Sequence, residues 1–82
     1  MDDSISEVIE YMEDLTNDDG VSKNVRAKIS KIISELKTAS EENINLKVNK
    51  ILSELDEIAS DANLDQFTRQ QIWSISGMLE GI

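Results

Sequence analysis

The hydrophobic residues of this chain recur at intervals of three and four positions in four successive stretches. This spacing places apolar side chains along one face of a helix, so each stretch predicts one amphipathic α-helix. The predicted helices cover residues 4–16, 23–37, 41–60 and 66–80. Their inward-facing positions are Ile5, Val8, Ile9, Met12 and Leu15, then Val25, Ile29, Ile32, Ile33 and Leu36, then Ile44, Val48, Ile51, Leu52, Leu55 and Ile58, and finally Ile72, Ile75 and Leu79.

Polar residues at the helix ends support these limits. Ser4, Ser22, Ser40 and Asp65 stand before the four helices, where such side chains accept hydrogen bonds from the free backbone N–H groups of a first turn. Asn-Asp-Asp-Gly at positions 17–20 should end the first helix, with Gly20 able to adopt a positive φ. We therefore expect four separate helices joined by short turns.

The chain uses one pattern twice. Residues 51–80 align with residues 8–37 after a shift of 43 positions, and the apolar positions then coincide. Both copies also place an aliphatic residue three positions after an Asp and an Arg five positions later still. The matched residues are Asp18 with Asp61, Val21 with Leu64, and Arg26 with Arg69. Because helical periodicity alone would not repeat these polar residues, we infer a tandem helical hairpin.

A chain of 82 residues has room for one domain, which we expect to span residues 1–82. The first hairpin would cover residues 4–37 and the second residues 41–80. Short connections favour antiparallel neighbours, so the sequence predicts an all-α, up-and-down four-helix bundle. The alternative is two stacked HEAT-like hairpins, because the repeat length lies within the range of that class; such solenoids usually need three or more repeats.

The amino-acid composition argues against most catalytic mechanisms. The sequence contains no Cys and no His, so it has no thiolate nucleophile, and it lacks the commonest metal ligand and general base. We expect a protein that is not an enzyme and that uses no cofactor and no metal. No apolar run is long enough to span a membrane, and the first residues are acidic where a signal peptide would be basic, so we expect a cytoplasmic protein.

Charge is distributed unevenly around a net value of −9. Residues 1–21 hold eight acids and no base, whereas residues 22–50 hold seven bases and three acids. The overall negative charge disfavours general nucleic-acid binding, but the basic second helix leaves open an RNA- or ribosome-associated function. The RNA-binding residues in that alternative would be Lys23, Lys28, Lys31 and Lys37.

Two segments resemble a known family. The sequences NDDGVSKNVR and LDEIASDANLDQFTRQQIWSI are similar to the small archaeal proteins of uncharacterised protein family 0147. Ser22, Ala62 and Asp65 replace residues that tend to be proline in that family, which should loosen both turns. The resemblance implies an all-helical bundle of archaeal origin, and it implies no reaction, cofactor or catalytic residue.

The repeated acid and arginine are the first candidate site. Asp18 with Arg26, and Asp61 with Arg69, would lie at the turn of each hairpin. Each guanidinium could reach the carboxylate or the free carbonyls at the end of the preceding helix. We interpret these residues as turn-locking pairs, with a binding role for the arginines as the alternative.

The second hairpin carries apolar residues that the first one lacks. Phe67, Trp73 and Met78 align with Asn24, Ser30 and Glu35, respectively. Trp73 could fill a gap between the hairpins, or Phe67 and Trp73 could form an exposed patch that docks a partner or a second copy of the chain. Arg69 lies four residues before Trp73, within reach of a cation–π contact.

These observations predict a small protein-interaction or adaptor module. Its partner-binding residues would be Phe67, Arg69 and Trp73 in the fourth helix. The RNA-associated function remains the alternative, and a homodimer that buries Trp73 between two copies is a third possibility. Membrane binding is not expected.

Overall fold

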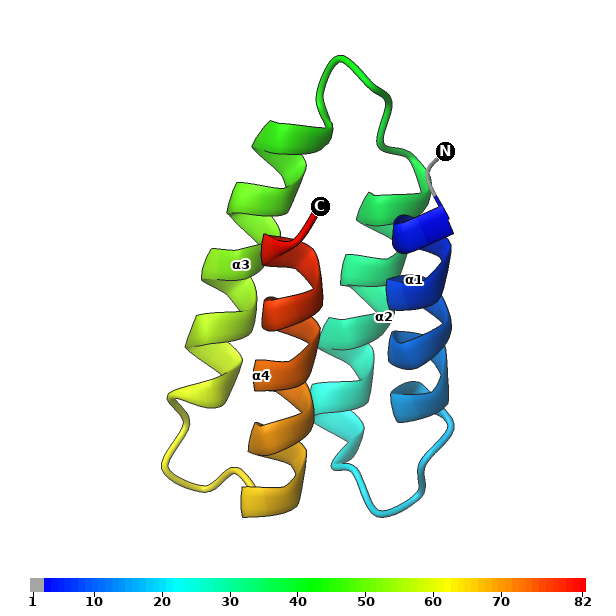
Figure 1. The fold of residues 1–82 in the computed structure, drawn as a ribbon. Helices are drawn as coiled ribbons and strands as arrows, with labels where there is room; N and C mark the ends of the chain where they lie inside the picture. Colours follow the sequence, from blue (N-terminus) through cyan, green and yellow to red (C-terminus); the bar gives the residue numbers. More distant parts are fainter. Residues whose placement is uncertain (1–2) are drawn as a thin grey trace.

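The computed structural model describes residues 3–82 as four antiparallel helices. They are α1 (Asp3–Thr16), α2 (Lys23–Lys37), α3 (Ile44–Ala59) and α4 (Gln66–Glu80). Figure 1 shows that the turns after α1 and α3 lie at one end of the molecule, and that the α2–α3 connection lies at the other end. Among the described residues, no helix combines the length and apolar character that crossing a membrane requires.

The order of neighbours around the bundle distinguishes the two predicted architectures. α1 packs against α2 and α4, and α3 packs against α4 and α2, whereas, within residues 3–82, the backbones of α1 and α3, and those of α2 and α4, do not come close to each other. Stacked HEAT-like hairpins would instead place the equivalent helices of the two repeats, α1 and α3, side by side. The structure is therefore a closed up-and-down four-helix bundle, and the favoured prediction is confirmed.

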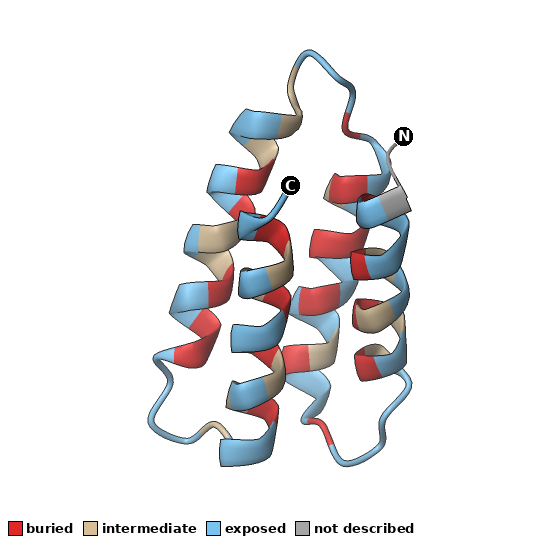
Figure 2. Ribbon diagram, viewed as in Figure 1, coloured by how far each residue is buried: buried red, intermediate tan, exposed pale blue. Residues whose placement is uncertain are grey.

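The core lies along the axis of this bundle, where all four apolar stripes meet (Figure 2). Most of the predicted inward positions are buried, while Ile9, Ile44 and Leu52 are partly buried at its margin. Leu46, which lies off the predicted stripe of α3, is 75% exposed. The largest fully buried side chains come from every helix: Val8, Met12, Ile29, Ile32, Leu36, Ile51, Leu55, Ile72, Ile75 and Leu79.

The start of α3 differs from the prediction. α3 begins at Ile44 rather than near residue 41, and Asn43 rather than Ser40 occupies its N-cap position. The side chain of Asn43 instead turns back along the loop, where its Oδ1 accepts a hydrogen bond of 2.7 Å from the backbone N–H of Ser40. This local bond closes a turn over residues 40–43, which competes with continuation of the helix.

Gly20 also differs from the prediction, because no residue in the described chain has a positive φ. The first turn is closed by a side chain instead. Asp18 Oδ1 accepts a hydrogen bond of 2.8 Å from the backbone N–H of Gly20, as in an Asx turn. The acid, and not the conformational freedom of glycine, ends this helix.

The two hairpin turns use the same hydrogen bonds, each displaced by the length of the repeat. Asp61 Oδ1 accepts a bond of 2.9 Å from the N–H of Asn63, which matches the bond between Asp18 and Gly20. In both turns the backbone carbonyl of that acid also accepts a bond of 3.1 Å, from Val21 in the first turn and from Leu64 in the second.

The helices that follow these turns are capped in matched ways. Ser22 Oγ accepts a hydrogen bond of 3.3 Å from the N–H of Val25, and Asp65 Oδ2 accepts one of 3.2 Å from the N–H of Thr68. The predicted caps of α2 and α4 are therefore confirmed. The repeat in the sequence corresponds to a repeat in backbone geometry, down to individual N–H groups.

The glycine at position 77 leads to a first prediction. Gly77 lies within α4, and a Cβ added there would meet nothing within 4 Å. Because glycine in a helix interior is less stable than alanine, Gly77→Ala should raise the free energy of unfolding by about 0.5–1 kcal/mol. Thermal unfolding followed by circular dichroism would show this as a Tm higher by roughly 2–8 °C.

Gly20→Ala is the matched control for this prediction. Its added Cβ would lie 3.1 Å from Asp18 Oδ1, the atom that closes the first turn. We expect no gain in stability there. A stabilisation of similar size from both substitutions, or none from Gly77→Ala, would contradict the interpretation of Gly77 as an unpacked helix position.

Candidate functional site

Trp73 lies on the surface of α4, with 54% of its side chain exposed. A side chain this accessible does not fill a gap between the hairpins, so that interpretation of Trp73 does not hold. The aligned residue of the first hairpin is Ser30, which is also exposed. The two repeats thus share a solvent-facing position at which only the second presents an aromatic ring.

The indole lies beside a groove between α3 and α4. Leu52, Ser53 and Asp56 of α3 line one side of the groove. Trp73, Ser76 and Glu80 of α4 line the other side, and the volume of this shallow, open groove is about 390 Å³. The side chain of Leu52 is partly buried and packs against the core, so the groove has an apolar floor, an aromatic wall and two carboxylates.

Gly77 leaves the surface of α4 open next to this groove. It lies four residues after Trp73, which places both on the same side of a helix. No atom of this chain approaches the position where a Cβ would stand, so close packing within the chain does not account for a glycine here.

Phe67 is exposed as well, with 60% of its side chain accessible, but it does not extend this surface. It lies six residues before Trp73 on the same helix. At 3.6 residues per turn, the two side chains leave the helix about 120° apart. The structure therefore divides the predicted Phe67–Trp73 patch into two separate exposed residues, and only Trp73 borders the groove.

Arg69 is held by the turn that connects α3 to α4. Its Nε donates a hydrogen bond of 2.9 Å to the carbonyl of Ala59 at the end of α3. One of its terminal nitrogens donates to the carbonyls of Asp61 and Leu64, at 2.9 and 3.3 Å, and the other donates to Gln66 Oε1 at 2.9 Å. Arg69 thus meets Asp61 through the backbone carbonyl rather than through the carboxylate.

Arg26 behaves differently from its repeat partner. The structure does not pair it with Asp18; its closest carboxylate is the fully exposed Asp19, at 3.9 Å. Its buried Nε has no hydrogen-bond partner among residues 3–82. The residue that aligns with Gln66 is Lys23, which offers no acceptor and carries the same charge as Arg26, so the contact that orients Arg69 has no equivalent in the first turn.

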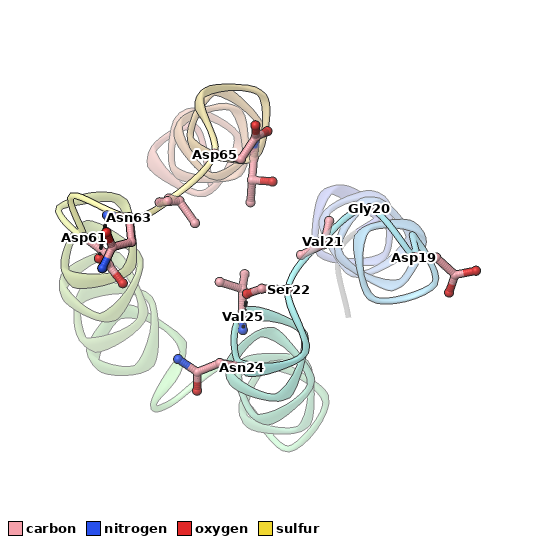
Figure 3. A pocket seen from close by; sticks show the side chains of 11 residues that line it. Asp19, Gly20, Val21, Ser22, Asn24, Val25, Asp61, Asn63 and Asp65 are labelled. Carbon is pink, nitrogen blue, oxygen red and sulfur yellow. Dashed lines mark hydrogen bonds between the residues drawn. The ribbon is translucent and has the colours of Figure 1, made fainter.

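Between the two turns lies an open cavity of about 350 Å³ (Figure 3). Val21 and Ser22 line it from the first turn, and their aligned residues Leu64 and Asp65 line it from the second. In Figure 3 the Asp19 side chain points away from the other lining residues. The carboxylates of Asp61 and Asp65 already accept backbone N–H groups, and the described residues contain no cluster of acids able to hold a metal ion.

The lysines of α2 do not form one basic face. Lys23, Lys28, Lys31 and Lys37 are all exposed, but they are spread over about half of the helix circumference. Lys37 pairs with Glu13 of α1 at 3.7 Å. Lys28 and Lys31 line a small cavity of about 200 Å³ together with Glu54 and Glu57 of α3. Acidic side chains therefore lie next to three of the four lysines.

Two carboxyl groups meet where α2 packs on α3. Burial of the Glu54 carboxyl raises its pKa above the ordinary value, and the adjacent negative charge of Glu35 and a hydrogen bond between the two side chains raise it further. The positive charges of Lys50 and Lys31 act in the opposite direction. One oxygen of Glu54 is buried without a hydrogen-bond partner, so the charged form is poorly solvated.

Sequence reasoning had identified Trp73 but not the residues that surround it. Leu52, Ser53 and Asp56 belong to the preceding helix, and only packing of α3 against α4 brings them to the indole. One signal was available within α4: Trp73, Ser76 and Glu80 follow one another at helical spacing, with Gly77 between them. That spacing marks a continuous surface strip.

Fold and surface together define a small four-helix bundle of two hairpin repeats, with an aromatic groove on the second. The chain belongs to Uncharacterised protein family (UPF0147), whose sequence profile matches residues 1–82. A UPF0147 protein of Methanosarcina mazei is 33% identical to it over 95% of this chain and 83% of the relative. One of Archaeoglobus fulgidus is 33% identical over 95% of this chain and 87% of the relative.

Solved structures agree with this assignment. The crystal structure of a UPF0147 protein from Thermoplasma acidophilum matches with a TM-score of 0.87 and 30% identity, over 96% of this chain and 92% of that chain. A second crystal structure, of a protein of unknown function, matches with a TM-score of 0.84 and 30% identity, over 98% and 90%. The resemblance seen in the two turn segments is thereby confirmed, and it extends over the whole chain.

The difference between the two arginines leads to a second prediction. Arg69→Lys should lower the free energy of unfolding by about 1–3 kcal/mol, because one ammonium group cannot replace the fork of donors that bonds three carbonyls and an amide. Arg26→Lys should change it by less than about 1 kcal/mol, because only a solvent-exposed ion pair is altered. Urea denaturation followed by circular dichroism measures both, and equal losses would show that Arg69 does not stabilise its turn in this way.

The raised pKa of Glu54 leads to a third prediction. The folded state resists loss of this proton, so ionisation of Glu54 reduces stability as the pH rises above the ordinary carboxyl range. Glu54→Gln should therefore raise the free energy of unfolding at pH 7, and this gain should disappear as the pH falls below the ordinary carboxyl pKa of 4.5, where both states take up the proton. The exposed Glu57→Gln serves as a control in the same helix. A gain from Glu54→Gln that is independent of pH would contradict this explanation.

Proposed function

We propose that this protein is an interaction module that docks a segment of another protein in the groove between α3 and α4. The observation that carries the proposal is the exposed Trp73 on an ordered helix, beside a groove with an apolar floor. Tryptophan is enriched among the residues that dominate protein interfaces, where its large ring becomes desolvated. The proposal is for a binding protein and not for an enzyme.

The divergence of the two repeats supports this assignment. The core positions of the two hairpins match, so a tryptophan at position 73 is not needed to complete the fold. Its repeat partner is the polar Ser30, which shows that a hydrophilic residue suits the same place in a hairpin. Gly77, four residues after Trp73, is a second exposed position at which no described residue packs against the place of a side chain.

The hydrogen bonds of Arg69 support a different role for it from the one proposed for Trp73. Four of the five guanidinium N–H donors of an arginine can be accounted for by bonds within the turn. We therefore propose that Trp73 makes the partner contact and that Arg69 positions the start of the helix that carries it. Phe67 lies outside the groove.

RNA binding through α2 has less support. A phosphate-binding surface needs several cations that face the same way, and these lysines are spread around the helix with acids beside three of them. The aromatic residue that is exposed lies on α4, away from these lysines, and does not provide a stacking platform among them.

Site-specific cross-linking tests the proposal and gives a fourth prediction. A photo-reactive amino acid placed at position 53, inside the groove, should yield one discrete cross-linked protein in the source cell. The same reagent at position 10, the aligned and equally exposed position on α1, should not. Trp73→Ser should abolish the product from position 53, because it removes the aromatic wall of the groove.

The mass and nuclease sensitivity of the product identify the other possibilities. A product with twice the mass of the chain would mean that the groove binds a second copy, and a product lost on nuclease treatment would favour the RNA-associated function. Equal cross-linking from positions 53 and 10, or a product that survives Trp73→Ser, would disprove docking in this groove.

A further inference from the structure

We propose that the segment docked in this groove is cationic, with an arginine or lysine side chain that lies over Trp73 between Asp56 and Glu80. The inference rests on the proposed docking function of the same groove and specifies the chemistry of its partner. Two observations support it: the groove carries negative charge, and the basic side chains of α3 and α4 form their contacts outside the groove.

The two carboxylates of the groove have no counter-ion. Asp56 and Glu80 are exposed, and neither forms an ion pair within residues 3–82. Residues 51–82 contain six acids and one base, Arg69. Since the Arg69 guanidinium bonds to carbonyls in the turn, it does not neutralise either carboxylate.

The basic residues of α3 face the opposite side of that helix. Lys47 Nζ donates to Thr38 Oγ1 at 2.9 Å and to the Glu35 carbonyl at 3.4 Å, and Lys50 pairs with the Glu35 carboxylate at 3.6 Å. Both contacts lie where α3 meets α2. All three cations of the two helices that form the groove are thus used elsewhere, and the groove keeps its negative charge.

The groove suits an extended cationic side chain. The face of an indole attracts an ammonium or guanidinium group, and adjacent carboxylates strengthen the site. Leu52 offers an apolar surface for the methylene stem of such a side chain, while Ser53 and Ser76 are too short to block it. Gly77, which follows the groove residue Ser76, carries no side chain that could obstruct a partner there.

Other partners fit the same surface less well. A purely apolar segment would remove Asp56 and Glu80 from water without pairing them, which is costly. An acidic segment or a nucleic acid would meet two unpaired carboxylates. A second copy of this groove would oppose like charges. Charge complementarity therefore selects a basic segment of another protein.

Trp73 is the only tryptophan of the chain, so its fluorescence reports directly on the groove in the intact protein. The probes are three helical peptides of about 15 residues with leucines at identical positions and Arg, Gln or Glu at the polar positions. We expect the Arg peptide to shift the Trp73 emission saturably, and the Gln peptide to bind about tenfold or more weakly. The Glu peptide should not bind.

A charge-matched pair of variants excludes attraction by overall charge. Asp56→Asn with Glu80→Gln changes the net charge from −9 to −7, and so does Glu10→Gln with Asp14→Asn on the exposed face of α1. The first pair should weaken binding of the Arg peptide about tenfold or more, and the second by less than about threefold. Circular dichroism would verify that both variants remain folded.

Three results would overturn the inference: tight binding of the Gln peptide, equal weakening by both pairs of substitutions, or no response of Trp73 to the Arg peptide. If cross-linking at position 53 persisted with any of them, the groove would dock a partner that is not cationic, and the proposed function would stand. If that cross-link were absent as well, the proposed function would fail with it.

Discussion

Burial of four apolar stripes in one common core is the constraint on which this structure depends. Each helix has a single apolar face, and a hairpin of two such helices leaves half of its core surface exposed to water. Each hairpin therefore buries its remaining apolar surface against the other hairpin. This gives a closed arrangement in which α1 packs against α4 and α2 packs against α3. Side chains from every helix, such as Met12, Leu36, Leu55 and Ile75, become inaccessible in the same interior. Short turns and capped helix ends then determine the direction of each helix.

Once the repeated core and turns hold the fold, the surfaces of the two hairpins are free to diverge. Equivalent backbone bonds recur in both turns, yet Arg69 bonds to three carbonyls and to Gln66 in its turn, whereas among the described residues Arg26 forms an ion pair of 3.9 Å with Asp19. In the same way Trp73 replaces the Ser30 of the first repeat without disturbing the interior. Residues that both repeats share are those that the bundle fold requires. Residues found in one hairpin alone are not required by the fold. We therefore look for functional residues among those found in one hairpin alone.

Membership of UPF0147 extends the fold to archaeal relatives and to solved structures with TM-scores above 0.8, and it leaves the role of the protein to be argued from its surface. The groove beside Trp73 combines an aromatic ring with two carboxylates that form no ion pair within residues 3–82, and the exposed Gly77 follows the groove residue Ser76. Each of these features taken alone would not indicate a binding site, since exposed apolar residues and solvated acids are common on protein surfaces. Their occurrence at one place, on the hairpin that departs from its repeat, is what favours a docking surface.

The sequence by itself determined the four helices, their inward positions, the caps Ser22 and Asp65, and the hairpin repeat, because helical periodicity and capping are local properties of the chain. The predicted start of α3 was wrong, because the Asn43 side chain bonds to the loop. The predicted Phe67–Trp73 patch overlooked a spacing of six residues, which places the two side chains about 120° apart on a helix. Only the tertiary structure decided between a closed bundle and stacked hairpins, and only it brought Leu52, Ser53 and Asp56 to the indole. The reason is physical: neighbours from different helices are set by how whole helices pack, and that packing depends on every stripe at once.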